Sequence, residues 1–156
     1  DYDFTKVSVG VGTDKHVRTT LDANYVVNDN VALRANVLYG SEEVPDRGPA
    51  DRERKGAALS GLFKISDRLD VTVDYYGFRA SDTPDLGSYL TGTGSARKPA
   101  KDVPVYAQDK DFLTSDVDTL TARVKFKIDD NVRFTNLTRR GRSGAYCRKY
   151  DLYDRW

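Results

Sequence analysis

Apolar and polar residues alternate along most of this chain, which is the pattern of a β-strand whose two faces meet different surroundings. The clearest case runs from Val17 to Tyr39, where two alternating stretches flank the turn triplet Asn28-Asp29-Asn30. One side of the alternation holds Val17, Thr19, Leu21, Ala23, Tyr25 and Val27, then Val31, Leu33, Ala35, Val37 and Tyr39. The other side holds Arg18, Thr20, Asp22 and Asn24, then Arg34 and Asn36. Two amphipathic strands joined by a tight turn are therefore predicted.

The same unit recurs, and an antiparallel up-and-down meander of seven or eight strands is expected. The expected strands are 4–12, 17–27, 31–39, 57–65, 69–75, 120–128 and 132–135, with an eighth over 145–156 after a turn at 141–144. Three-residue turns are expected at 28–30, 66–68 and 129–131, and long loops at 40–54 and 79–117, which are rich in charge, Pro and Gly. No segment keeps a helical i, i+3, i+4 pattern for three turns, so the fold class is all-β.

The order of the connections favours a membrane barrel. In a meander, alternate connections lie at the same end, which places every tight turn at one end and both long loops at the other. Transmembrane β-barrels have this layout, and a tilted spanning strand needs about 9–11 residues. The stretch 17–27 meets that length, so part of a transmembrane β-barrel is predicted.

Composition narrows the function classes. The 156 residues suit a single domain, and 38% hydrophobic residues with 31% charged residues exclude a disordered chain. A net charge of +1 with scattered basic residues argues against a nucleic-acid surface, and a lone cysteine, Cys147, excludes an internal disulfide. His16 is the only histidine and lies in an expected turn, and no nucleophile motif or phosphate loop is present. We therefore expect no enzyme, no metal site and no bound cofactor.

Six segments stand out by their order and spacing along the chain. They are Arg18 to Tyr25, Asn30 to Asn36, Pro45-Asp46-Arg47, Glu53 to Leu59, Thr83-Pro84-Asp85-Leu86-Gly87 and Asp118 to Arg123. Together they resemble the barrel of TonB-dependent outer-membrane siderophore receptors, and most closely the catecholate type. The resemblance covers about residues 4–138, and residues 139–156 show no family pattern. It implies that the chain is the N-terminal part of such a barrel, in the bacterial outer membrane, without the family's plug domain.

The same resemblance implies a function in transport. A ferric siderophore would be the transported ligand, captured by the external loops at about 40–54 and 79–117. The implied partners are the rest of the barrel and the plug, a TonB-type energy-coupling protein acting through that plug, and outer-membrane lipid. The chain opens Asp1-Tyr2-Asp3-Phe4 without a signal peptide, so we expect a mature chain or a piece of a longer one.

Candidate ligand-binding residues are the basic and aromatic side chains of the two expected loops, because ferric siderophores are often anionic and catecholates are aromatic. They are Arg47, Arg52, Arg54, Arg79, Tyr89, Arg97, Lys98 and Tyr106. A second set shares the polar side of the strands and would contact a plug or line a channel: Arg18, Asp22, Arg34, Asp74, Arg123, Lys125 and Arg133. The plainer interpretation is solvated loop residues in the first set and cross-strand charge pairs in the second.

Two other architectures fit the same pattern. One is a complete eight-stranded outer-membrane protein with an adhesive or structural role, which requires the first and last strands to pair. The other is a soluble β-barrel or sandwich that binds a small apolar ligand. It requires the side of Leu21, Leu33, Val71 and Val124 to face inward.

Overall fold

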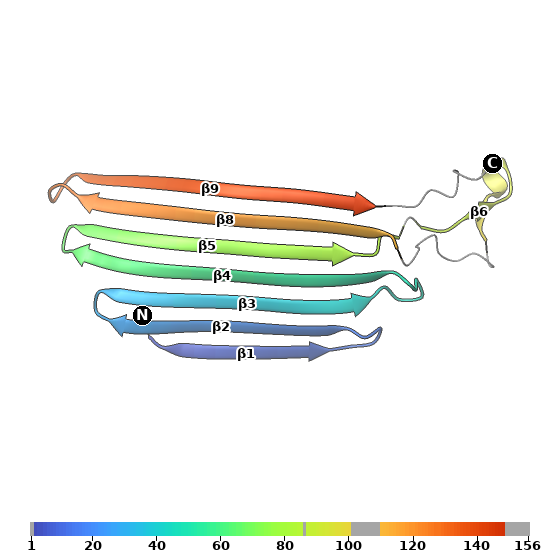
Figure 1. Ribbon diagram of the computed structural model, residues 1–156, viewed down its shortest axis with the longest axis horizontal. Coiled ribbons are helices and arrows are strands. Elements are labelled where there is room, and N and C mark those ends of the chain that lie inside the picture. The colour runs from blue at the N-terminus through green and yellow to red at the C-terminus, as the bar shows by residue number, and fades with distance from the viewer. Residues whose placement is uncertain (1, 86, 101–109, 149–156) are drawn as a thin grey trace.

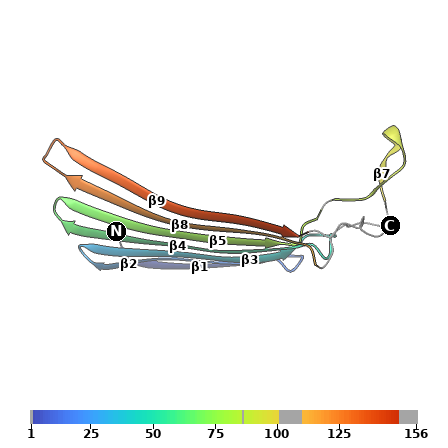
Figure 2. The ribbon, with the colours of Figure 1, turned by 45° about the horizontal axis from the view of Figure 1, so that its top comes forward.

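Seven long antiparallel strands form one open sheet (Figure 1). The structure is a computed structural model that describes residues 2–85, 87–100 and 110–148. The strands are β1 (Phe4–Val11), β2 (Val17–Asn28), β3 (Val31–Glu43), β4 (Asp51–Ser66), β5 (Leu69–Asp82), β8 (Phe112–Lys127) and β9 (Arg133–Arg148), paired in that order. A small hairpin of β6 (Leu90–Thr91) and β7 (Lys98–Pro99) encloses the short 3-10 helix η1 (Gly94–Ala96) and lies beyond the end of the sheet (Figures 1 and 2).

The predicted all-β meander is confirmed, and its three tight turns lie where the sequence placed them. Asn28 pairs with Val31 across the first turn, Ser66 with Leu69 across the second, and β8 and β9 are joined around residues 129–131. These turns share one end of the sheet, the turn end, and the connections 12–16, 44–50 and 83–111 share the other, the loop end (Figure 1).

The boundaries of the strands at the loop end differ from those predicted. β3 continues to Glu43 and β4 begins at Asp51, so the expected loop 40–54 shrinks to residues 44–50. The expected loop 79–117 loses its first and last residues to β5 and β8. The predicted turn at 141–144 is wrong, because residues 133–148 form one strand paired with β8 throughout. The expected eighth strand therefore falls partly inside β9, and its residues 149–156 lie outside the described part of the chain.

Registered pairing gives the sheet two chemically distinct faces. On the apolar face, Leu21 lies opposite Val37, which lies opposite Ala57, and Tyr75 lies between Leu59 and Leu120. The aromatic side chains of this face include Tyr25, Tyr39, Phe63, Tyr75 and Phe126. The polar face carries all seven residues predicted to share the opposite side: Arg18, Asp22, Arg34, Asp74, Arg123, Lys125 and Arg133.

No second layer covers either face in the described part of the chain. Ala50 is the one buried hydrophobic residue there, and most of the exposed large hydrophobic side chains belong to the apolar face. Leu33 remains 43% exposed, so among the described residues this face is not packed against a second layer. β1 and β9 make no contact with each other and leave two open edges, which excludes a closed eight-stranded barrel among the described strands.

The limit of the apolar residues shifts steadily from strand to strand. Moving toward the loop end, the apolar run on this face ends at Val17 of β2, Tyr39 of β3, Ala57 of β4, Tyr75 of β5 and Leu120 of β8, and Phe112 stands apart farther along β8. Through the register, this limit moves by six residues over four strand spacings. At about 3.4 Å per residue and about 4.8 Å per spacing, a flat apolar band requires strands tilted by roughly 45°. Spanning strands of membrane barrels tilt by about this angle.

No helix within the described residues has the length and apolar character to cross a membrane. The strands supply the long elements of this fold.

Candidate ligand-binding site on the polar face

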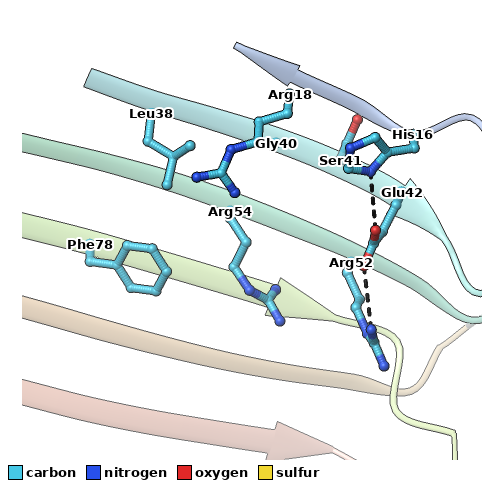
Figure 3. A pocket seen from close by; sticks show the side chains of 9 residues that line it. All are labelled: His16, Arg18, Leu38, Gly40, Ser41, Glu42, Arg52, Arg54 and Phe78. Carbon is cyan, nitrogen blue, oxygen red and sulfur yellow. Dashed lines mark hydrogen bonds and ion pairs between the residues drawn. The ribbon is translucent and has the colours of Figure 1, made fainter. Parts of the chain in front are cut away.

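A hollow of about 320 Å³ lies on the polar face near the loop end, and we name it the rim hollow (Figure 3). Its lining comes from the 12–16 connection and from β2, β3, β4 and β5. The lining residues are His16, Arg18, Leu38, Gly40, Ser41, Glu42, Arg52, Arg54 and Phe78. Three arginines and a histidine, which lie within a stretch of some forty residues of the sequence, thus line one space.

The first part of its wall is a chain of three side chains. Nδ1 of His16 lies 3.1 Å from one carboxylate oxygen of Glu42, and Nη1 of Arg52 donates to the other at 3.3 Å. The connection that holds His16 is itself fixed to β3, because the N–H of Glu43 donates to the carbonyl of Asp14 at 2.8 Å. Glu42 therefore positions a histidine and an arginine side by side (Figure 3).

Two further arginines, Arg54 and Arg18, line the rim hollow and differ in their hydrogen bonding. Arg54 is held by the carboxylate of Asp82, to which Nη2 donates at 2.9 Å while Nη1 contacts the other oxygen. Nη1 also donates to the carbonyl of Glu53 at 2.8 Å. Arg18, by contrast, has no hydrogen-bond or ion-pair partner among the described residues, and it points across β3 toward Arg54 (Figure 3). Among the described residues, Arg18 therefore leaves all of its N–H donors available to a ligand.

The floor of the rim hollow is apolar. Leu38 and Phe78 lie on it, and the register places Gly56 opposite both of them. A side chain at Gly56 would bring its Cβ within 3.2 Å of the Phe78 ring, so glycine allows the ring to lie against the strand. A flat aromatic surface beside guanidinium groups suits a ligand that is both anionic and aromatic.

A second arginine–carboxylate pair fastens two connections at the loop end. Arg47, in the β3–β4 loop, donates from Nε and Nη2 to the two carboxylate oxygens of Asp85 at 2.5 and 2.8 Å. Its Nη1 also donates to Ser88 at 3.0 Å. The hydrogen bonds from Arg47, supported by the N–H of Gly87, hold the pKa of Asp85 below its usual range. Arg47 therefore joins the 44–50 loop to the segment after β5.

Of the predicted loop candidates that the structure describes, only Arg52 and Arg54 line the rim hollow. Arg79 lies on β5 rather than in a loop, and its side chain is on the apolar face beside Asp116. Arg52 and Arg54 also lie on a strand, β4. Tyr89, Arg97 and Lys98 belong to the β6–β7 hairpin region, and Tyr106 lies outside the described residues. Of the eight loop candidates, the structure brings Arg52 and Arg54 together in the hollow.

The sequence does not predict three of the residues that line the rim hollow. His16 is expected only in a turn, and Glu42 and Phe78 are not among the candidate residues. The alternation of residues in β2 does predict that Arg18 lies on the polar face. This prediction is the feature of the sequence that points to the hollow. In the described part of the chain, no three His, Cys, Asp or Glu side chains gather into a candidate metal site.

Comparison with known proteins places this geometry in context. No family model matches the chain. The probable TonB-dependent siderophore receptor PiuA of Acinetobacter baumannii is 32% identical over 141 residues, covering 86% of this chain and 19% of the receptor. The catecholate siderophore receptor Fiu of Escherichia coli K12 is 29% identical over 144 residues, covering 85% of this chain and 19% of the receptor. The probable TonB-dependent receptor BfrD of Bordetella pertussis is 39% identical over 84 residues, or 53% of this chain and 11% of the receptor.

Solved structures agree with the sequences. The crystal structure of the siderophore receptor PiuA matches with a TM-score of 0.75, and the open form of the ferric-catecholate import receptor Fiu matches with 0.77. Both are 28% identical, and each match covers 93% of this chain, with 22% of PiuA and 24% of Fiu. The chain spans about a fifth of the length of the curated relatives it matches. Its homologues are thus TonB-dependent siderophore receptors of the outer membrane, and its seven-stranded sheet resembles part of their barrel.

Proposed function

We propose that this chain forms a wall of a receptor barrel that takes up a ferric siderophore, with the polar face toward the lumen and the apolar face toward lipid. The rim hollow is the observation that carries the proposal. It combines a donor-rich arginine, Arg18, with the aromatic floor of Phe78 on the face turned away from the apolar band.

The chemistry of the rim hollow fits a ferric catecholate, the ligand class of the ferric-catecholate import receptor Fiu. An anionic catecholate oxygen accepts charge-assisted hydrogen bonds from Arg18, and its ring packs on Phe78. Arg52 and Arg54 are oriented by Glu42 and Asp82, whose carboxylates offset their charge, and they add hydrogen-bond donors at fixed positions. The site binds and passes on a ligand without bond chemistry, so we assign no enzymatic activity and no resident cofactor.

The loop tether belongs to the same function. Arg47 and Asp85 hold the 44–50 loop against the segment that follows β5, at the end where a ligand enters. Transport then needs the remaining barrel strands, a plug in the lumen and a TonB-type energy-coupling protein. Tyr89, Arg97, Lys98 and Tyr106 remain candidate contacts on the external segment.

The proposal is tested in the complete outer-membrane protein with Arg18→Gln. Loss of one charge-assisted contact, about 1.5–3 kcal/mol, should weaken ferric-catecholate binding about tenfold or more. Binding is followed by quenching of intrinsic fluorescence, and uptake by radioactive iron accumulated in cells. Arg123→Gln is the matched control, because Arg123 shares the polar face but lies toward the turn end, opposite Thr72 and Leu137.

Unchanged affinity in Arg18→Gln, with Arg123→Gln also unchanged, would remove the rim hollow from ligand capture. Equal loss in both variants would indicate a general effect of luminal charge rather than a binding site.

A further inference from the structure

The apolar face changes character sharply at the loop end. Beyond Tyr39 and Tyr75, charged side chains predominate on this face, which also carries Phe112 and Tyr146. The charged side chains nearest the apolar band are Glu53, Lys55, Arg79, Asp116, Asp118, Arg140 and Arg142. Because the apolar band is proposed to face lipid, this charged belt lies at the level where hydrocarbon gives way to headgroups.

Two tyrosines mark that level. Tyr75 leans over Gly77, where an added Cβ would lie 2.6 Å from the phenol oxygen, and its hydroxyl donates to Asp118 at 2.7 Å. The hydroxyl of Tyr39 donates to Glu53 at 3.4 Å. Both rings therefore lie in the apolar band with their hydroxyls in the charged belt, as amphipathic aromatics do at a membrane interface.

Within the belt, a hollow of about 210 Å³ lies between Arg79 and Arg142, and we name it the outer hollow. Its other lining residues are Asp116, Asp118, Gly144 and Tyr146. Each aspartate already accepts a hydrogen bond or ion pair, from Arg79 Nε at 3.3 Å and from Tyr75. The arginines keep spare donors: the Arg79 side chain is 73% exposed, and Arg142 has no ion-pair partner among the described residues.

We propose that the outer hollow binds the anionic phosphate headgroup of a lipid in the leaflet on the loop side. Two guanidinium groups facing one space match the paired oxygens of a phosphate. Arg140, on the same face one position nearer the band, gives the site a net positive charge. The band below it, including Leu120 and Tyr75, receives the acyl chains. This site is separate from ligand capture, which uses the opposite face.

The experiment uses the complete protein in mixed micelles with phosphatidic acid, which carries a phosphate monoester, or phosphatidylcholine as the neutral comparison. Native mass spectrometry counts retained lipids. Phosphatidic acid should be retained over phosphatidylcholine, and Arg79→Gln with Arg142→Gln should reduce that preference about tenfold. Arg18→Gln is the matched control on the other face and should retain lipid as the unaltered protein does. Arg79→Lys with Arg142→Lys should recover part of the preference, which would show that the experiment measures charge rather than folding.

Equal retention of both lipids, or an unchanged preference in the double Gln variant, would overturn the proposal. Complete displacement of phosphatidic acid by inorganic phosphate would also overturn it, because the site would then recognise a free anion rather than a lipid. Loss of the preference in Arg18→Gln would show that the effect does not belong to this face.

Discussion

The two faces of the sheet share one backbone but differ in chemistry, because one carries apolar side chains and the other carries polar and charged side chains. On the apolar face, Leu21, Val37 and Ala57 form one apolar row across three strands. On the polar face, charges are matched across strands, as where Arg34 donates to both oxygens of Asp22 at 3.1 and 3.0 Å. Since successive residues alternate faces, any position and its neighbour test the two environments directly.

The largest contrast is expected from Ala35→Arg and Asn36→Arg, two adjacent positions on opposite faces of β3. Ala35 lies in the middle of the apolar band, where a lipid-exposed arginine costs about 2–4 kcal/mol. Asn36 lies opposite Asp22, so an arginine there meets water and a carboxylate. Denaturant titration of the complete protein in vesicles measures both. Equal destabilisation by the two variants would contradict the assignment of the faces.

A smaller effect is expected from Gly77→Ala on the apolar face compared with Gly56→Ala on the polar face. The new Cβ at position 77 would force away the Tyr75 hydroxyl and its hydrogen bond to Asp118, a loss of about 0.5–1.5 kcal/mol. The Cβ at position 56 meets the Phe78 ring at 3.2 Å, which shifts the floor of the rim hollow. Gly77→Ala should therefore lower stability more, and Gly56→Ala should weaken ligand binding more. The reverse ranking would disprove the roles given to the two rings.

Acid should release the loop tether. The pKa of Asp85 is lower in the folded protein, so its pairing with Arg47 stabilises the loops at neutral pH. That contribution begins to fall near the unfolded value of about 3.9 and is lost as pH drops through the lower folded value. Hydrogen exchange at the Ala50 amide, bonded to the Arg47 carbonyl at 2.8 Å, should lose protection relative to strand amides over that range. Asp85→Asn should remove the pH dependence, and an unchanged profile in this variant would refute the tether.

The smallest effect is expected from Arg52→Gln, which removes an exposed ion pair with Glu42 on the polar face. The two side chains are 53% and 37% exposed, and such pairs contribute about 0.2–1 kcal/mol, weakened further by salt. Melting curves at low and high salt measure the difference. A loss as large as that of Ala35→Arg would mean that Arg52 is not solvated as described.

The alternation of apolar and polar residues predicted the strands accurately within the apolar band. It predicted them inaccurately between the band and the loop end. β3 past Tyr39 reads Gly40-Ser41-Glu42-Glu43, which looks like a loop, yet Glu42 and Glu43 pair with Arg52 and Asp51 of β4. Backbone pairing continues there although neither face is apolar, so hydropathy gives no signal. The wrong prediction of a turn at 141–144 has the same cause. Gly141 and Gly144 are typical turn residues, yet they pair with Thr119 and Asp116 within β9 and β8.

The candidate site was harder to predict than the fold. Parity alone placed Arg18 on the correct face. The contacts that shape the site join residues far apart in sequence, such as Arg47 with Asp85 and His16 with Glu42. Such pairs depend on which strand ends lie together and on rotamers, neither of which a single sequence contains.

Because the limit of the apolar band shifts from strand to strand, the strands extend by different lengths beyond the band at the loop end. On β2 the band reaches Val17, the first residue of the strand, whereas β8 continues for eight residues beyond Leu120 to Phe112. At about 3.4 Å per residue and a tilt near 45°, β8 extends roughly 19 Å beyond the apolar band. On the proposed orientation, with the apolar band toward lipid, the loop-end part of β8 stands in solvent, whereas the 12–16 connection lies near the bilayer surface. A ligand that approaches from solution would then reach the end of β8 before Arg18.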